Sequence, residues 1–306
     1  MSWEAYSVVR KLHDSADYDG ALAAITSERE SLGDVWPYAQ NLEASCYEHK
    51  GDVEKACAIL EAADRNGEAN FWTYYQLAAI HRNLRNPRKS IETSYKAHAA
   101  VGWFASKNNG YLFTHDFFSP NIPDWTRWFN DYITHTPIIC GEIGSWQGGS
   151  STWLLDQIVS KRGGKLVCFD TFEGSSEHLT WLDSIGGKLE ELFDHNIQAT
   201  GFASFCEKVI GDSKMTLRSI APDSFDFFYI DGAHEALYAI QDAILVWPLV
   251  RIGGFILFDD YDYSFPNAPQ RNTKRAIDAF TSIFEEEIEI VAKGRQVLIR
   301  KKVPQA

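Results

Sequence analysis

The sequence of 306 residues has no apolar run near the roughly 20 residues that a membrane-spanning helix needs. Residues 1–20 carry charges and lack the apolar centre of a secretory leader. Basic residues are few: 29 lysines and arginines stand against 42 aspartates and glutamates, for a net charge of −13. This balance argues against a broad basic face for nucleic acid or anionic membranes. A cytoplasmic protein that binds neither is expected.

Cysteine is also scarce. The five cysteines are Cys46, Cys57, Cys140, Cys168 and Cys206, and none has the CxxC spacing of a typical structural zinc site. Cys140 and Cys168 lie within strand-like apolar runs. We therefore expect buried free thiols in a reducing compartment, with no disulfides and no structural zinc.

Proline is nearly absent from the first hundred residues, where Pro37 is the only one before Pro87. Residues 1–102 are rich in alanine and predict an all-helical domain. A repeat of about 34 residues runs through it, because residues 44–63 align with residues 78–97. The stretch resembles tetratricopeptide repeats, although Gly51 in one copy corresponds to Arg85 in the next. Two interpretations stay open: a docking surface for a peptide, protein or substrate, or a helical cap that packs on the next domain or on a second subunit.

Residues 103–136 form a bridge that is dense in aromatic side chains, among them Trp103, Phe113, Trp125 and Phe129. So many rings cannot all face water. The segment is predicted to be either inter-domain core or an aromatic lid over a substrate pocket.

The third predicted part, residues 137–306, begins with PIICGEIGSWQGGSS at residues 137–151. This stretch indicates a buried strand, a glycine turn and the start of a helix. Glycines at 144, 148 and 149 let the backbone approach a ligand closely. The helix start offers unpaired N–H groups to anionic or polar ligand atoms. A nucleotide-like cofactor is the expected ligand.

Strands and helices then alternate. Apolar strands are predicted at 165–170, 206–212, 225–231 and 253–260, and a hairpin that turns at Lys293 and Gly294 closes the chain. Alternating units with continuous apolar strands predict an α/β fold: a Rossmann-like, doubly wound sheet of seven strands covered on both faces. The last strand is predicted to be antiparallel, at an edge of the sheet.

Four of these predicted strands end in acids, at the sheet edge where ligands bind in such folds. Asp170 lies where a carboxylate typically meets two ribose hydroxyls. Asp212 lies where an adenine edge is expected. Either acid has a second interpretation, as a helix N-cap or a turn residue.

Asp231, Asp259 and Asp260 are expected to converge, because the strands before them should be neighbours. Three like charges are costly unless neutralised, and hard oxygen ligands suit Mg²⁺ or another divalent cation. Capping of the following loops without a metal is the alternative. His234, three residues after Asp231, could accept a hydroxyl proton. It could equally be a helix-start histidine that bonds a backbone carbonyl.

On these residues the chain resembles the class I S-adenosylmethionine-dependent methyltransferases, and most of all the macrocin O-methyltransferase group. GEIGSWQGGSS, FDTFEG, YIDGAH and GGFILFDDY carry the resemblance. It implies methyl transfer to a hydroxyl, with Asp231, Asp259 and Asp260 around a divalent ion. The predicted catalytic residues are His234 and Asp231. The predicted cofactor residues are Glu142, Gly144, Ser145, Gly148, Ser150, Asp170, Asp212 and Asp231.

The sequence departs from the macrocin pattern at Ala233, where that group commonly carries an acid as base. His234 is the candidate that remains. The expected acceptor is a sugar, glycan or natural-product-like small molecule. A peptide or protein recruited by the repeats and a non-catalytic scaffold are the alternatives, and a homo-oligomer stays open. Loops 171–206 and 261–272 are expected to determine the acceptor.

Overall fold

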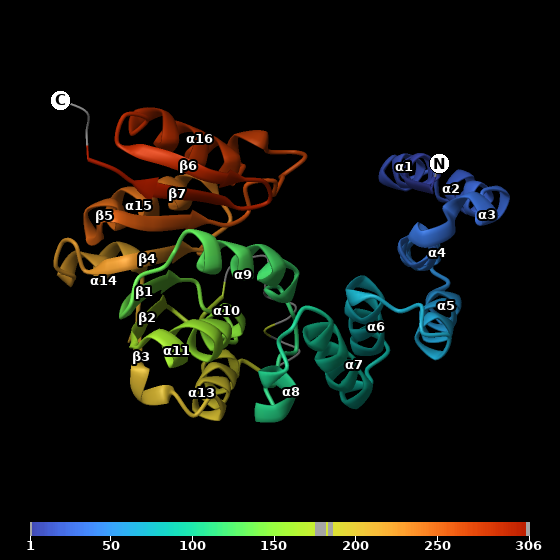
Figure 1. Ribbon diagram of the computed structural model, residues 1–306, viewed down its shortest axis with the longest axis horizontal. Coiled ribbons are helices and arrows are strands. Elements are labelled where there is room, and N and C mark those ends of the chain that lie inside the picture. The colour runs from blue at the N-terminus through green and yellow to red at the C-terminus, as the bar shows by residue number, and fades with distance from the viewer. Residues whose placement is uncertain (1, 175–181, 183–185, 304–306) are drawn as a thin grey trace. The chain divides into compact units, whose positions relative to one another are not determined.

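The structure is a computed structural model that describes residues 2–174, 182 and 186–303 (Figure 1). The chain divides into two compact units, Met1–Ser119 and Pro120–Ala306. The segment 103–136, predicted as a bridge, therefore contributes its first part to one unit and its second part to the other. Among the described residues, no helix is both long and apolar enough to cross a membrane.

The first unit is built from helices joined by short turns. Helix α1 packs against α2, α4 against α5, and α6 against α7, so the unit consists mainly of helix pairs. Its helices are α1 (Ser2–Asp14), α2 (Tyr18–Ser27), α3 (Arg29–Leu32), α4 (Trp36–His49), α5 (Val53–Arg65), α6 (Phe71–Asn83), α7 (Pro87–Ala100) and α8 (Ala105–Asn109).

The second helix of each pair starts with the same device. Asp17, Asp52 and Asn86 cap α2, α5 and α7, and each accepts a hydrogen bond from the backbone N–H three residues later. The turns before α5 and α7 also correspond, because Gly51 and Arg85 both have positive φ, at 83° and 54°. Glycine adopts this conformation freely and arginine at a cost. A repeating helix pair is thus visible, while its tetratricopeptide identity stays a prediction.

The aromatic rings of the predicted bridge pack within the unit to which each belongs. In the first unit Trp103 stacks on Phe113, with ring centroids 5.7 Å apart. In the second unit Trp125 and Phe129 lie against Phe227, at 5.8 and 4.9 Å. These rings supply core to each unit, and the lid stays a prediction.

The second unit contains one sheet of seven strands in the order β3-β2-β1-β4-β5-β7-β6 (Figure 1). The first five strands along the chain pair in parallel. This confirms the predicted doubly wound sheet. The strands are β1 (Ile138–Ile143), β2 (Gly164–Asp170), β3 (Cys206–Ile210), β4 (Phe225–Ile230), β5 (Val250–Phe258), β6 (Ile288–Lys293) and β7 (Val297–Lys301).

The last strand is antiparallel as predicted, but it does not lie at the edge. β7 pairs antiparallel with both β5 and β6, so β6 becomes the edge strand. Two buried neighbours suit the side chains of β7, because Val297, Leu298 and Ile299 are all fully buried. β6 carries the exposed charge Glu289 and suits an edge, where charged side chains limit further pairing.

Helices cover the two faces of the sheet, and alternate strand residues point to opposite sides. On β4, Phe228 belongs to a core that includes Ala243 and Ile277, from two of these helices. Phe227 and Tyr229 face the other way, against Trp125. The helices are α9 (Ile122–Asp131), α10 (Gly149–Leu154), α11 (Ser160–Arg162), α13 (Leu189–Ala199), α14 (Ser213–Thr216), α15 (Ala236–Val246) and α16 (Thr273–Ile283).

All five cysteines are free thiols, as predicted. Cys168 and Cys206 come nearest to each other, with their Sγ atoms 3.9 Å apart on the neighbouring strands β2 and β3. Burial, the thiol of Cys206 and the charge of Glu142 raise the pKa of Cys168 well above its ordinary value. This thiol therefore stays protonated and is a poor nucleophile.

Candidate active site at the carboxyl edge of the sheet

The glycine turn after β1 passes directly against the end of β4. Gly144 has φ of 82°, and a Cβ built there would lie 1.8 Å from the carbonyl oxygen of Asp231. Only glycine fits both the backbone angle and this approach. The turn ends at Gly148, whose left-handed backbone precedes α10. The two predicted ligand-binding regions, the turn and the acids after β4, are therefore adjacent.

Glu142 lies beneath this turn. It is fully buried, and its carboxylate accepts hydrogen bonds from the hydroxyls of Ser145, Ser150 and Ser151. Burial raises the pKa of Glu142, and the three hydroxyl donors oppose that effect. The carboxylate thus holds the turn and the start of α10 onto β1. Ser145 and Ser150, predicted with Glu142 to touch a cofactor, both donate to Glu142 here and so fix the turn.

Asp170 connects β2 to the same turn. Its Oδ2 accepts from the backbone N–H groups of Ser145 at 2.7 Å and Trp146 at 3.0 Å, while Oδ1 accepts from Phe172 N at 2.8 Å. Burial raises the pKa of Asp170, and the backbone donors oppose this. Oδ2 already accepts two hydrogen bonds, whereas Oδ1 accepts one and has a second lone pair for a ligand hydroxyl. The structure thus brings Asp170 and the Gly144 turn together.

Asp212 has a different environment. It caps α14 by accepting from Lys214 N at 3.0 Å, and its Oδ2 lies 2.7 Å from Lys214 Nζ. The hydrogen bond from Lys214 lowers the pKa of Asp212, which is exposed. The capping interpretation therefore accounts for the contacts of Asp212. Among the described residues, its side chain forms no hydrogen bond or ion pair with the glycine turn or with the other acids that follow strands. Asp212, Asp231 and Asp259 follow their strands instead of ending them, because β3, β4 and β5 stop one or two residues earlier than predicted.

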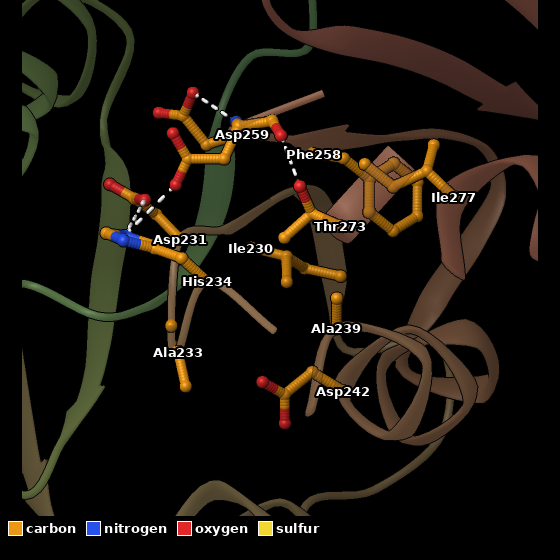
Figure 2. Close-up of a pocket in the computed structure, with 12 residues that line it drawn as sticks. Ile230, Asp231, Ala233, His234, Ala239, Asp242, Phe258, Asp259, Thr273 and Ile277 are labelled. Atoms are coloured by element: carbon orange, nitrogen blue, oxygen red, sulfur yellow. Dashed lines mark hydrogen bonds and ion pairs between the residues drawn. The ribbon is translucent and has the colours of Figure 1, made fainter. Parts of the chain in front are cut away.

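Three side chains at the ends of β4 and β5 converge, as Figure 2 shows for Asp231 and His234. His234 Nε2 lies 3.0 Å from Asp260 Oδ2 and 3.8 Å from Asp231 Oδ1. The donor atoms of Asp231, His234 and Asp260 all lie within 4.8 Å of one another. Two carboxylates and an imidazole form a donor set that a divalent cation can use. The residues therefore fit a metal ion.

Asp259 was predicted in that set, but its side chain is held elsewhere. Its Oδ2 accepts from Tyr229 OH and from Gln296 Nε2 at 3.0 Å. Its Oδ1 accepts from the backbone N–H of Asp260 at 2.7 Å. Asp260 has φ of 56°, which turns the chain after β5 so that the neighbouring carboxylates point in different directions. The structure thus groups His234, and not Asp259, with Asp231 and Asp260.

Two residues that the sequence reasoning missed support these acids. The hydroxyl of Tyr229 shares its one proton between Asp231 Oδ2, at 2.9 Å, and Asp259 Oδ2. Gln296 accepts at Oε1 from Trp125 Nε1 at 2.8 Å, which fixes its amide toward Asp259. A signal existed for both: each is a polar side chain within or beside an apolar strand and must find a buried partner.

The charges of this cluster are poorly neutralised. Burial and the neighbouring Asp259 and Asp260 raise the pKa of Asp231 well above its ordinary value. Burial and Asp259 raise the pKa of Asp260 to about 6. The pKa of Tyr229 also rises, through burial and the adjacent carboxylates. Like charges so close require either a proton or a cation. This need supports a metal ion more directly than the sequence pattern does.

A small pocket opens beside these acids (Figure 2). Its lining combines apolar side chains with acidic ones. The residues that line it are Ile230, Asp231, Gly232, Ala233, His234, Ala239, Asp242, Phe258, Asp259, Asp260, Thr273 and Ile277. Of the two loops expected to determine the acceptor, 261–272 lies within the described residues. Part of 171–206, namely 175–181 and 183–185, lies outside them.

Asp242 on α15 is a buried acid of this pocket, and burial raises its pKa to about 6 from an ordinary 3.8. Since the folded state binds this proton more tightly, its stabilising contribution is full below about pH 4 and is lost as the pH rises through about 6. Asp242→Asn cannot ionise and keeps an acceptor for Ser213 Oγ. We expect it to be more stable than the wild type at pH 7.5, by roughly 1–3 kcal/mol.

The measurement is the thermal unfolding midpoint of both proteins between pH 4 and pH 7.5. The gain should shrink toward pH 4, where wild-type Asp242 is protonated. Asp212→Asn is the control and should show no such gain, because Asp212 is exposed and its pKa is lowered. Equal midpoints for Asp242→Asn and the wild type at pH 7.5 would contradict the assignment.

Comparison with known proteins gives one family match. Residues 142–261 match a family model described as a methyltransferase domain. An uncharacterized protein of Acanthamoeba polyphaga mimivirus is 29% identical over 125 residues, which is 40% of this chain and 51% of that protein. The chain thus spans about half the length of this relative.

Several solved structures are distantly similar. A protein of Corynebacterium glutamicum has 17% identity and a TM-score of 0.46, over 73% of this chain and 99% of that one. MycE, a methyltransferase of the mycinamycin biosynthetic pathway, has 17% identity and a TM-score of 0.43, over 65% and 53%. TomG, an O-methyltransferase of Streptomyces achromogenes, has 16% identity and a TM-score of 0.43, over 65% and 86%.

Proposed function

We propose that this chain, whose residues 142–261 match a methyltransferase-domain model, transfers a methyl group from S-adenosylmethionine to a hydroxyl of a small molecule with the help of a divalent cation. One observation supports this most strongly. Asp170 accepts two backbone hydrogen bonds from the glycine turn, and this turn lies against Asp231. The proposed site for the methyl donor and the acid cluster therefore share one edge of the sheet.

S-adenosylmethionine would lie over the glycine turn. Asp170 would face the ribose and accept from its hydroxyls at Oδ1, and the backbone at Gly144 and Gly148 would approach the cofactor closely because no Cβ intervenes. Glu142 would contribute indirectly, by fixing the turn through its serine hydroxyls. The cofactor supplies a methyl group that its sulfonium already activates. The protein therefore mainly has to align the acceptor and exclude water.

The acid cluster would prepare the acceptor. Asp231 and Asp260 fit a divalent cation such as Mg²⁺, which when bound would hold the acceptor oxygens and lower the pKa of the hydroxyl. The hydroxyl oxygen forms the new bond to the methyl carbon. The bond between that carbon and the sulfonium sulfur breaks, and its electron pair stays on sulfur. His234 is the base that we assign to the hydroxyl proton. Its Nε2 faces both acids, so a role as a cation ligand is the competing assignment.

We place the acceptor among sugars, glycans and natural-product-like hydroxyl compounds, because a cation held by Asp231 and Asp260 would bind neighbouring hydroxyl oxygens. Two alternatives to a small-molecule acceptor are a peptide or protein acceptor that the helix pairs bind, and a scaffold that catalyses no reaction. We also propose that the protein is cytoplasmic and that it can form a homo-oligomer.

The test uses the full chain. Calorimetry with S-adenosylmethionine should detect binding, and incubation with methyl-labelled donor, Mg²⁺ and a cell extract should label the low-molecular-weight fraction. Label in the protein fraction instead would favour the peptide or protein acceptor. No binding at millimolar donor would favour the scaffold and would overturn the proposal.

A further inference from the structure

A second group of metal-ligating side chains lies in the first unit, far along the chain from the strand-end acids. Cys57 and Glu61 are four residues apart on α5, so both project from one face of that helix. His81 lies on α6, the next helix along the chain, which contacts α5. The Sγ, carboxylate and imidazole donor atoms all lie within 4.8 Å of one another.

The burial of His81 is the second observation. Its side chain is 5% exposed, and among residues 2–174, 182 and 186–303 no group hydrogen-bonds to its ring. The ring nitrogens of His81 still reach solvent and, among these described residues, make no hydrogen bond within the protein, so they are open to an ion. Here the nearby ligating atoms are a thiol and a carboxylate, both of which bind metals when deprotonated.

We propose that Cys57, Glu61 and His81 bind a borderline-soft divalent cation, of which Zn²⁺ is the type. Thiolate, imidazole and carboxylate are the three ligand classes that Zn²⁺ takes in proteins, and three protein ligands leave a fourth position for water. Mg²⁺ and Ca²⁺ prefer oxygen and do not suit this set. The ion would join α5 of one helix pair to α6 of the next. This inference does not depend on the proposed methyl transfer.

Of the three residues, Glu61 is the one that already has ion-pair partners, which a metal ion would have to displace. Its Oε1 lies 3.3 Å from Lys89 Nζ and its Oε2 lies 3.9 Å from Arg65 Nη1. Both cations are exposed to solvent, and ion pairs of this kind contribute little. A divalent cation can therefore displace them. A search for CxxC spacing does not find this set, because it contains a single cysteine. Its other two members are a glutamate one helical turn away and a histidine on another helix.

The experiment is a titration of the full-length, metal-free protein with Co²⁺, which replaces Zn²⁺ and reports its ligands by absorption. One equivalent should produce a thiolate-to-cobalt charge-transfer band, and added Zn²⁺ should abolish it. The acids Asp231 and Asp260 with His234 offer no sulfur, so ions bound there do not give this band. Cys57→Ser should lose the band. Cys206→Ser, which removes a partly buried cysteine of the other unit, should keep it.

His81→Gln and Glu61→Gln test the other ligands, and each should weaken Co²⁺ binding at least about 10-fold. Glu61 is on the solvent side, so Glu61→Gln provides a variant whose fold is expected to persist; circular dichroism checks each variant. In the wild type, Zn²⁺ should also raise the thermal midpoint. No charge-transfer band in the wild type, or a band that survives in Cys57→Ser, would overturn the proposal.

Discussion

Asp170→Asn is expected to weaken the binding of S-adenosylmethionine about 100-fold, or roughly 2–3 kcal/mol, because hydrogen bonds to a charged group are worth about 1.5–3 kcal/mol. The carboxylate both holds the glycine turn, through Ser145 N and Trp146 N, and faces the expected ribose. Asparagine keeps the size but replaces one acceptor oxygen with a donor, which opposes a backbone N–H. Titration calorimetry with S-adenosylmethionine measures the change directly.

Asp212→Asn is the matched control, since it makes the same chemical change after the next strand of the sheet. Asp212 is occupied by Lys214 and by its capping role, so we expect the dissociation constant to change less than about 3-fold, as is usual for surface substitutions. Equal losses in both variants would restore the predicted adenine contact of Asp212. No loss in Asp170→Asn would remove the basis of the cofactor site.

Much of the fold of the second unit could be predicted because its strands are continuous apolar runs. Residues 225–230 are buried at every position, as expected for a parallel strand covered on both faces. The position of β7 could not be predicted in the same way. A hairpin sequence shows that two strands pair, but not which of them also pairs with β5. That choice follows from burial, since Val297 to Ile299 are more apolar than the strand before the turn.

The sequence predicted which residues of the candidate site lie near one another, but not the directions in which their side chains point. Acids after parallel strands share one edge of the sheet, so proximity of the glycine turn, Asp170 and Asp231 followed from topology. Whether Asp259 or Asp260 turns toward Asp231 depends on one backbone angle, the positive φ at Asp260, and on the buried donors Tyr229 and Gln296. The sequence indicates that Tyr229 and Gln296 need buried partners, but not which residues those partners are.

Asp231→Asn is expected to lower kcat/KM for methyl transfer about 10³-fold, within the range that loss of a proton-transfer group usually costs. Asparagine keeps an acceptor for Tyr229 OH, so the fold should persist and the thermal midpoint should change little. What disappears is the negative charge beside His234 and Asp260. Without it, the cluster holds a cation less tightly and orients the histidine less well. Steady-state kinetics with saturating S-adenosylmethionine give the ratio.

Asp259→Asn separates this role from a general effect of charge. Asp259 is turned toward Tyr229 and Gln296, so its loss should reduce kcat/KM at least 10-fold less than the loss of Asp231, a gap of about 1.4 kcal/mol. Equal losses would favour the predicted trio of aspartates around the cation. His234→Gln then decides between base and ligand. A base that accepts the hydroxyl proton would change the pH profile of kcat/KM and leave Mg²⁺ affinity intact, whereas a ligand would lower that affinity in parallel with activity.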